Sequence, residues 1–113
     1  MGETIKTDVK YKSYFWVKWE VQEQDTASNK STIAWSCGLS PGEQYYTNAI
    51  RMSAVTIGGV EVYAGGTYSD ITDYKDRTFG SGTLEVEHDG DGSKTLVVGA
   101  FSGWLYGNGD YNA

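Results

Sequence analysis

The sequence predicts an all-β protein built as an antiparallel β-sandwich. Apolar and polar residues alternate with period two in several segments, as they do in strands with one buried face. Fifteen glycines against a single proline indicate many tight turns. No segment shows the periodicity of an amphipathic helix. The 113 residues suffice for one hydrophobic core but not for two, so we expect a single domain over residues 1–113.

The clearest alternation covers residues 14–22, YFWVKWEVQ. Its odd positions are apolar and its even positions are largely polar, so we expect the odd positions to face the core. Two aromatic residues, Tyr14 and Trp16, fall on the even, outward face.

A second strand and a hairpin follow along the chain. Residues 31–38 alternate in the same way. Residues 54–57 and 60–63 are expected to pair around Gly58-Gly59, because a two-residue turn needs the positive φ that glycine adopts at low cost. The next stretch, residues 65–76, is expected to be irregular.

The C-terminal half contains one more predicted hairpin. Residues 83–88 alternate, residues 89–92 (DGDG) form a turn, and residues 94–101 return as the partner strand. The N-terminal segment 4–11 alternates poorly and fits an edge strand. About seven short strands separated by turns predict an immunoglobulin-like sandwich. The residues expected to be buried are Phe15, Val17, Trp19, Val21, Ile33, Trp35, Leu84, Val86, Leu96 and Val98.

Charge and composition exclude several classes of function. The net charge is −6 and no basic cluster is present, which argues against binding to nucleic acid or to an anionic membrane surface. No run of about 20 apolar residues is present to span a membrane, so we expect a soluble protein. Cys37 is the single cysteine and His88 the single histidine, which excludes an internal disulfide and a multi-cysteine or two-histidine metal centre.

The remaining candidates for chemistry have simpler structural explanations. Asp89-Gly90-Asp91 resembles the opening of a calcium loop, but position twelve of that loop is Ala100 instead of Glu, so we expect a turn. His88 precedes the turn and is expected to be structural. We therefore predict no catalytic residue, no metal and no cofactor, and a protein that is not an enzyme. The outward carboxylates, expected to be solvated, are Glu20, Glu61, Glu85 and Glu87.

Three segments resemble a known family. Residues 14–17 (YFWV) followed by residues 29–35 (NKSTIAW) are similar to an aromatic strand and an N-x-S-T-I-x-W strand, and residues 83–94 (TLEVEHDGDGSK) are similar to an H-x-x-D-G-S-K/T hairpin. The family comprises minor structural proteins of siphoviruses, from phages and prophages of Gram-positive bacteria, found in tail tips and baseplates. The resemblance covers roughly residues 10–101. It implies a non-enzymatic tail or tail-tip module in the virion, contacting other tail proteins and the host surface.

Aromatic residues beside Asn, Asp or Thr in predicted loops suggest an alternative, a carbohydrate-binding module. Rings can stack on the apolar C–H faces of a sugar, while amide and carboxylate groups bond its hydroxyls. The opposing interpretation is that these rings fold back and cover the ends of the sandwich. Tyr14 and Trp16 could instead contact a neighbouring subunit. The candidate ligand-binding residues are Tyr45, Tyr46, Trp104, Tyr106, Asn108 and Asp110.

The resemblance also predicts self-association. The relatives continue with one more strand after the last hairpin, whereas here residues 104–112 follow it. A missing strand would leave a sheet edge unpaired, and such edges invite pairing with another chain. The candidates to fill the edge are residues 4–11, residues 107–113, or a strand from a neighbouring subunit.

Overall fold

The computed structural model is all-β, with ten strands among the residues that it describes. These residues are 2–9, 12–25, 27, 30–42, 50–68, 75–87, 97–105 and 109–113. The all-β prediction is confirmed, and the strand count exceeds the expected seven.

The longer of two four-stranded sheets, sheet A, has the order β1-β2-β3-β8 with every pair antiparallel. Its strands are β1 (Gly2–Lys6), β2 (Tyr14–Asp25), β3 (Lys30–Ser40) and β8 (Arg77–Glu87). The predicted alternation of residues 14–22 and 31–38 lies in the two central strands of this sheet.

The second four-stranded sheet, sheet B, has the order β10-β9-β4-β7 and is also antiparallel. Its strands are β4 (Ile50–Met52), β7 (Gly66–Tyr68), β9 (Ser102–Leu105) and β10 (Gly109–Asn112). A separate two-stranded hairpin joins β5 (Val55–Ile57) to β6 (Val60–Tyr63).

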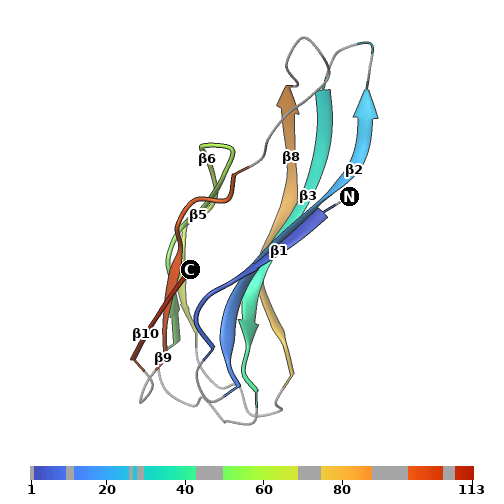
Figure 1. The fold of residues 1–113 in the computed structure, drawn as a ribbon. Helices are drawn as coiled ribbons and strands as arrows, with labels where there is room; N and C mark the ends of the chain where they lie inside the picture. Colours follow the sequence, from blue (N-terminus) through green and yellow to red (C-terminus); the bar gives the residue numbers. More distant parts are fainter. Residues whose placement is uncertain are drawn as a thin grey trace.

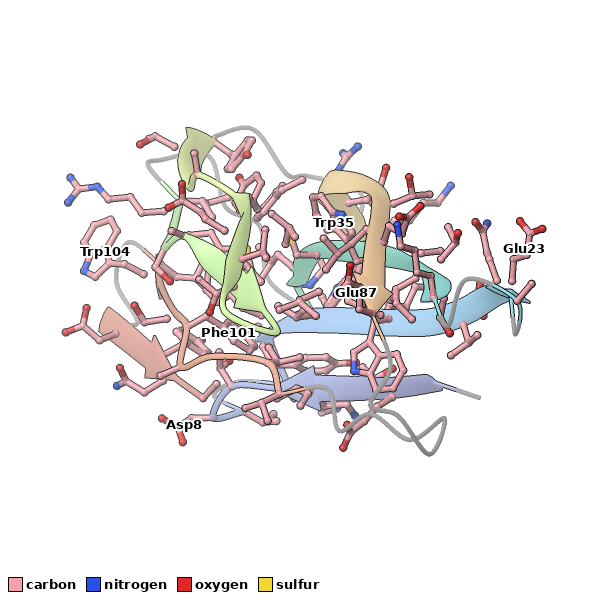
Figure 2. The ribbon with its side chains drawn as sticks, turned by 90° about the horizontal axis from the view of Figure 1, so that it is seen from above. Asp8, Glu23, Trp35, Glu87, Phe101 and Trp104 are labelled. Carbon is pink, nitrogen blue, oxygen red and sulfur yellow. The ribbon has the colours of Figure 1, made fainter. Side chains whose placement is uncertain are left out.

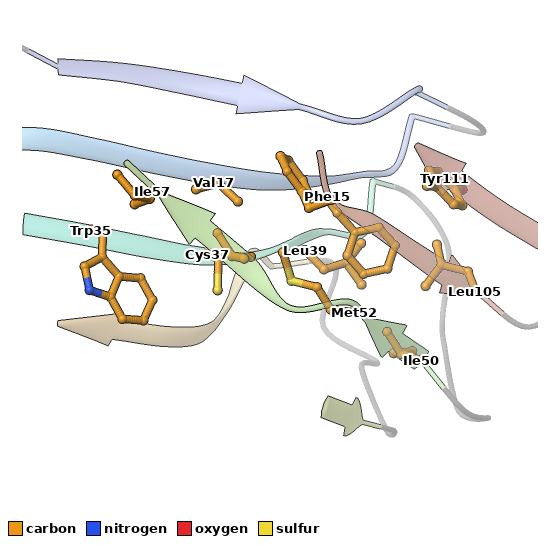
Figure 3. Close-up of a cluster of buried hydrophobic side chains, with 12 residues drawn as sticks. Phe15, Val17, Trp35, Cys37, Leu39, Ile50, Met52, Ile57, Leu105 and Tyr111 are labelled. Atoms are coloured by element: carbon orange, nitrogen blue, oxygen red, sulfur yellow. The ribbon is translucent and has the colours of Figure 1, made fainter. Parts of the chain in front are cut away.

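The two sheets form two layers with the hydrophobic core between them (Figures 1 and 3). In Figure 1 the ends of β2, β3 and β8 extend beyond the second layer, and the molecule measures 50 × 22 × 21 Å. Close approach of the layers depends on Gly103, since a Cβ there would lie 2.2 Å from the Phe15 ring. The core residues are Phe15, Val17, Trp35, Cys37, Leu39, Ile50, Met52, Val55, Ile57, Phe101, Leu105 and Tyr111.

The predicted core is confirmed in part. Phe15, Val17, Ile33 and Trp35 are buried. The remaining predicted residues within the described ranges are half-buried, because strand parity fixes the face that a side chain occupies but not what packs against it. The half-buried residues are Trp19, Val21, Leu84, Val86 and Val98, and Leu96 lies outside the described residues.

The Gly58-Gly59 hairpin is confirmed. Ile57 pairs with Val60, and the two glycines have φ of 60° and 81°. Positive φ at both central residues is the geometry of a type I′ turn, in which a side chain would strain the backbone.

Two predictions about chain segments are wrong. Residues 97–101 do not pair with β8; an isolated bridge joins Val98 to Ile57, and β8 pairs with β3 instead. Residues 66–68 form β7 in the stretch expected to be irregular. For the tail, where the sequence left open whether a further strand forms, the structure has the paired strands β9 and β10, and β9 also pairs with β4, which is distant in sequence.

The chain's own ends form edge strands in both sheets. Strand β1 is an edge of sheet A and β10 is an edge of sheet B. The two ends also meet, because the Asp8 N–H donates a 3.0 Å hydrogen bond to the Asn112 carbonyl. Both of the chain's own candidates for filling an edge are therefore used.

Candidate binding surface

Sheet B presents four aligned residues on its outward face, one from each strand. Asp110 of β10 pairs with Trp104 of β9, Trp104 pairs with Arg51 of β4, and Arg51 pairs with Thr67 of β7. We call this set the Trp104 row. Residues paired directly across adjacent strands share a face of the sheet, so their side chains are neighbours.

Alternation along each strand turns this row outward. The inward neighbours on β4, β9 and β10 are apolar or aromatic and buried, so the residues between them must face away from sheet A. Arg51, Asp110 and Thr67 are exposed and Trp104 is half-buried. Figure 2 shows Trp104 at the periphery of the molecule, on the side opposite to Glu23. The buried inward residues are Ile50, Met52, Gly103, Leu105 and Tyr111.

The guanidinium of Arg51 lies over the indole of Trp104. Its Cζ atom is 5.0 Å from the ring centroid, within the range of a cation–π contact. The row thus combines an aromatic ring, a cation beside it on β4 and a carboxylate beside it on β10. This combination can bind a ligand that has an apolar face and polar substituents.

The structure brings together two of the predicted ligand-binding residues. Trp104 and Asp110 are direct cross-strand partners. They lie on the paired strands β9 and β10 and not in loops, contrary to the prediction for this site. The other four predicted residues, Tyr45, Tyr46, Tyr106 and Asn108, lie outside the described residues.

Two tyrosines near the predicted loops are structural. The Tyr111 ring is fully buried and edge-on to Phe15 at 5.6 Å, and its hydroxyl lies 2.7 Å from Ser13 Oγ. Tyr68 stacks on Phe79 with ring centroids 3.9 Å apart, and its hydroxyl is hydrogen-bonded to that of Tyr63. Both rings pack in or against the core from strands β7 and β10, and not by folding back from loops over the ends of the sandwich.

Sequence reasoning missed Arg51. The only local signal is the triplet Ile50-Arg51-Met52, in which a charged residue stands between two apolar ones. Three residues are too few to establish a strand periodicity. The arginine becomes part of the surface only through pairing with β9, about fifty positions later in the chain.

The outward face of sheet A carries the other tryptophan that strand alternation turns outward, Trp16. Trp16 faces outward but is only 8% exposed. Its cross-strand partner is Gly38, and a Cβ at Gly38 would lie 2.9 Å from Trp16 Cζ2 and 1.8 Å from the Arg77 carbonyl oxygen. The ring therefore lies over the space left by a missing side chain, beside the backbone of Arg77. The Lys18 ammonium is 5.8 Å from the Trp16 ring centroid.

A groove of about 380 Å³ lies on the same face, over β1, β2 and β3. Its outward lining consists of short side chains from β1 and β3 and two long charged ones from β2. A smaller hollow of about 150 Å³, next to Tyr14 and Trp16, shares Thr4 and Lys18 with it. The outward lining residues of the larger groove are Gly2, Thr4, Lys18, Glu20, Ala34 and Ser36.

Within the described residues, the carboxylates singled out in the sequence are not gathered into a metal-binding group. Glu20, Glu61, Glu85 and Glu87 are exposed as predicted, and Glu85 pairs with Lys30 at 3.1 Å. Within the described ranges no group of three or more His, Cys, Asp or Glu residues is arranged to hold a metal ion. The predicted turn with His88, Asp89 and Asp91 lies outside those ranges. The same ranges contain no helix long and apolar enough to cross a membrane.

The single cysteine is poorly suited to nucleophilic chemistry. Cys37 is fully buried between the sheets, and burial raises the pKa of its thiol from 9.0 to about 11. The thiolate, which is the nucleophilic form, is therefore rare at neutral pH. Burial also raises the pKa of Tyr63, and the hydroxyl of Tyr68 adds to this effect.

Comparisons with known proteins found no matching family model, no matching curated protein and no matching solved structure.

Proposed function

We propose that this protein is a non-enzymatic module of a phage tail or tail tip that binds a glycan of the bacterial surface through the Trp104 row. The observation that carries the binding proposal is the alignment of Asp110, Trp104 and Arg51 across three adjacent strands. The placement in a virion rests on the resemblance of residues 14–17, 29–35 and 83–94 to siphovirus minor structural proteins.

The row suits a saccharide because its groups match the two kinds of surface that a sugar offers. The half-buried indole of Trp104 provides a ring for the C–H face, and Asp110 provides acceptors for hydroxyl groups. The scaffold fixes both side chains on paired strands, which reduces the ordering cost of binding. The immunoglobulin-like character expected from the sequence stays a prediction.

The test is binding of the intact protein to purified wall polysaccharides of Gram-positive bacteria, measured by calorimetry or on a glycan array. Trp104→Ala should reduce the affinity by at least about tenfold, as expected for removal of an aromatic anchor. The matched control is Tyr14→Ala, which removes a half-buried outward aromatic from the other sheet and should leave the affinity unchanged. Absence of binding by the unaltered protein, or equal losses in both variants, would refute the proposal.

A second candidate is a purely structural module that assembles through its sheet edges. Strands β1 and β10 each have a single strand partner within their sheets. Such an edge can accept a strand from a neighbouring subunit. Concentration-dependent sizing tests this candidate, and a proline at Thr4 of β1 should abolish self-association if that edge is used. A strictly monomeric protein at all concentrations would exclude self-association.

A further inference from the structure

We infer that the Trp104 row selects acidic glycans, in which a carboxylate or phosphate is attached to the saccharide, with Arg51 as the residue that determines this specificity. The inference rests on the proposed function and adds the chemical class of its ligand.

The first argument is the charge of Arg51. The chain carries a net charge of −6, yet within the described ranges Arg51 is exposed and forms no ion pair with a carboxylate. Its guanidinium instead contacts the indole of Trp104. A cation–π contact leaves the positive charge uncompensated, so the guanidinium can still attract an anion.

The second argument is the geometry of the guanidinium. Its N–H donors lie in the plane of the group and form a fork that matches the two oxygens of a carboxylate or phosphate. The Arg51 Cζ lies 5.0 Å from the centroid of the Trp104 ring, so an anion held by the fork would lie close to that ring. The ring also restricts the long side chain, which lowers the entropy lost when an anion binds.

The third argument is the order of the row. Arg51 and Asp110 flank Trp104 on opposite sides, two strand spacings or roughly 10 Å apart. Asp110 repels an anion and accepts hydroxyl hydrogens, so it disfavours the reversed orientation. A sugar ring on Trp104 would therefore direct its acidic substituent toward β4 and its hydroxyl groups toward β10.

The experiment compares three soluble probes by calorimetry: oligogalacturonate, which carries carboxylates on its sugars; phosphomannan, which carries phosphates on its sugars; and neutral dextran. We expect at least one acidic probe to bind about tenfold or more tightly than dextran, because a hydrogen-bonded charge contributes about this much. Comparing the two acidic probes tells which anion is preferred. Polyglutamate, an anion without sugar, is the control for binding by charge alone.

Variants separate this inference from the proposed function. Arg51→Gln should lose the preference for the acidic probe while keeping the weak affinity for dextran, and Arg51→Lys should recover only part of the preference because it lacks the fork. Trp104→Ala should weaken binding to every probe. Equal affinity for neutral and acidic glycans, or an unchanged preference in Arg51→Gln, would overturn the inference and leave the glycan-binding function standing. Binding of polyglutamate as tightly as the acidic glycans would also overturn it, and no binding to any probe would count against both proposals.

Discussion

Trp16 and Trp104 both occupy outward positions on a sheet, and both have a cation beside the ring, yet they differ in exposure. The Lys18 ammonium is 5.8 Å from the centroid of Trp16, and the Arg51 Cζ is 5.0 Å from that of Trp104. Trp16 is only 8% exposed, whereas Trp104 is half-buried. The difference comes from the neighbouring strand.

Trp16 lies opposite Gly38, which has no side chain, so the large ring collapses into the gap against the backbone. Trp104 lies between Arg51 and Asp110, whose exposed side chains flank the ring on both sides and leave no such gap. An outward tryptophan beside glycine is therefore expected to serve stability, and one between charged residues is expected to serve binding. Four substitutions test this comparison.

The largest loss of stability is expected from Trp16→Ala. Removing a ring that is 92% buried should lower the free energy of unfolding by about 3 kcal/mol, since the sheet surface cannot close the space. Urea denaturation monitored by circular dichroism measures this loss. A loss below about 1 kcal/mol would show that the ring contributes little despite its burial.

Gly38→Ala should also lower the free energy of unfolding, because Gly38 of β3 is the cross-strand partner of Trp16. The new Cβ would lie 1.8 Å from the Arg77 carbonyl oxygen, so the backbone of β8 must move. We expect a loss of about 1–3 kcal/mol in the free energy of unfolding. Gly82→Ala is the matched control in β8, because its Cβ would lie 3.2 Å from Trp35 Nε1 and needs only a small shift. Similar losses in both variants would contradict the assigned role of Gly38.

The rate at which the buried Cys37 thiol reacts with a labelling reagent measures how often the two layers open near Trp16. The raised pKa and full burial predict very slow labelling of the native protein by a thiol reagent at neutral pH, and rapid labelling in denaturant. Trp16→Ala should accelerate labelling roughly a hundredfold, in proportion to the opening equilibrium. Trp104→Ala should not change the labelling rate, and equal acceleration in the two variants would argue that the two rings have the same role.

The same thiol predicts how the free energy of unfolding changes at alkaline pH. Its pKa in the folded state, about 11, lies above the ordinary value of 9.0, so the unfolded chain releases the proton first. The stabilisation that comes from the neutral thiol is complete below pH 9 and is lost as the pH rises toward 11. Cys37→Ala should flatten this part of the curve, measured by urea titration at several pH values. An unchanged slope would show that other groups dominate it.

The smallest effect on stability is expected from Trp104→Ala. Its ring is half-buried on an outward face, so we expect a loss below about 1 kcal/mol, measured as for Trp16→Ala. A loss as large as that of Trp16→Ala would mean that Trp104 is a structural residue, and the binding proposal would lose its support.

How much the sequence could predict depended on how far apart the interacting residues are. The alternation of Phe15 and Val17 and the Gly58-Gly59 turn depend on neighbouring residues, and the sequence predicted both. The position of Arg51 beside Trp104 depends on pairing between segments about fifty residues apart. The short strands of sheet B contain too few residues for a periodic signal, so pairing with partners distant in sequence decides where they form.

The sequence by itself determined the all-β class, the inward face of β2 and β3, and the tight hairpin, because period-two hydrophobicity and glycine's tolerance of positive φ are local properties. Only the tertiary structure decided which outward tryptophan is accessible. Strand parity assigns a side chain to a face of the sheet, but burial depends on the cross-strand neighbour, which is Gly38 for Trp16 and the pair of Arg51 and Asp110 for Trp104.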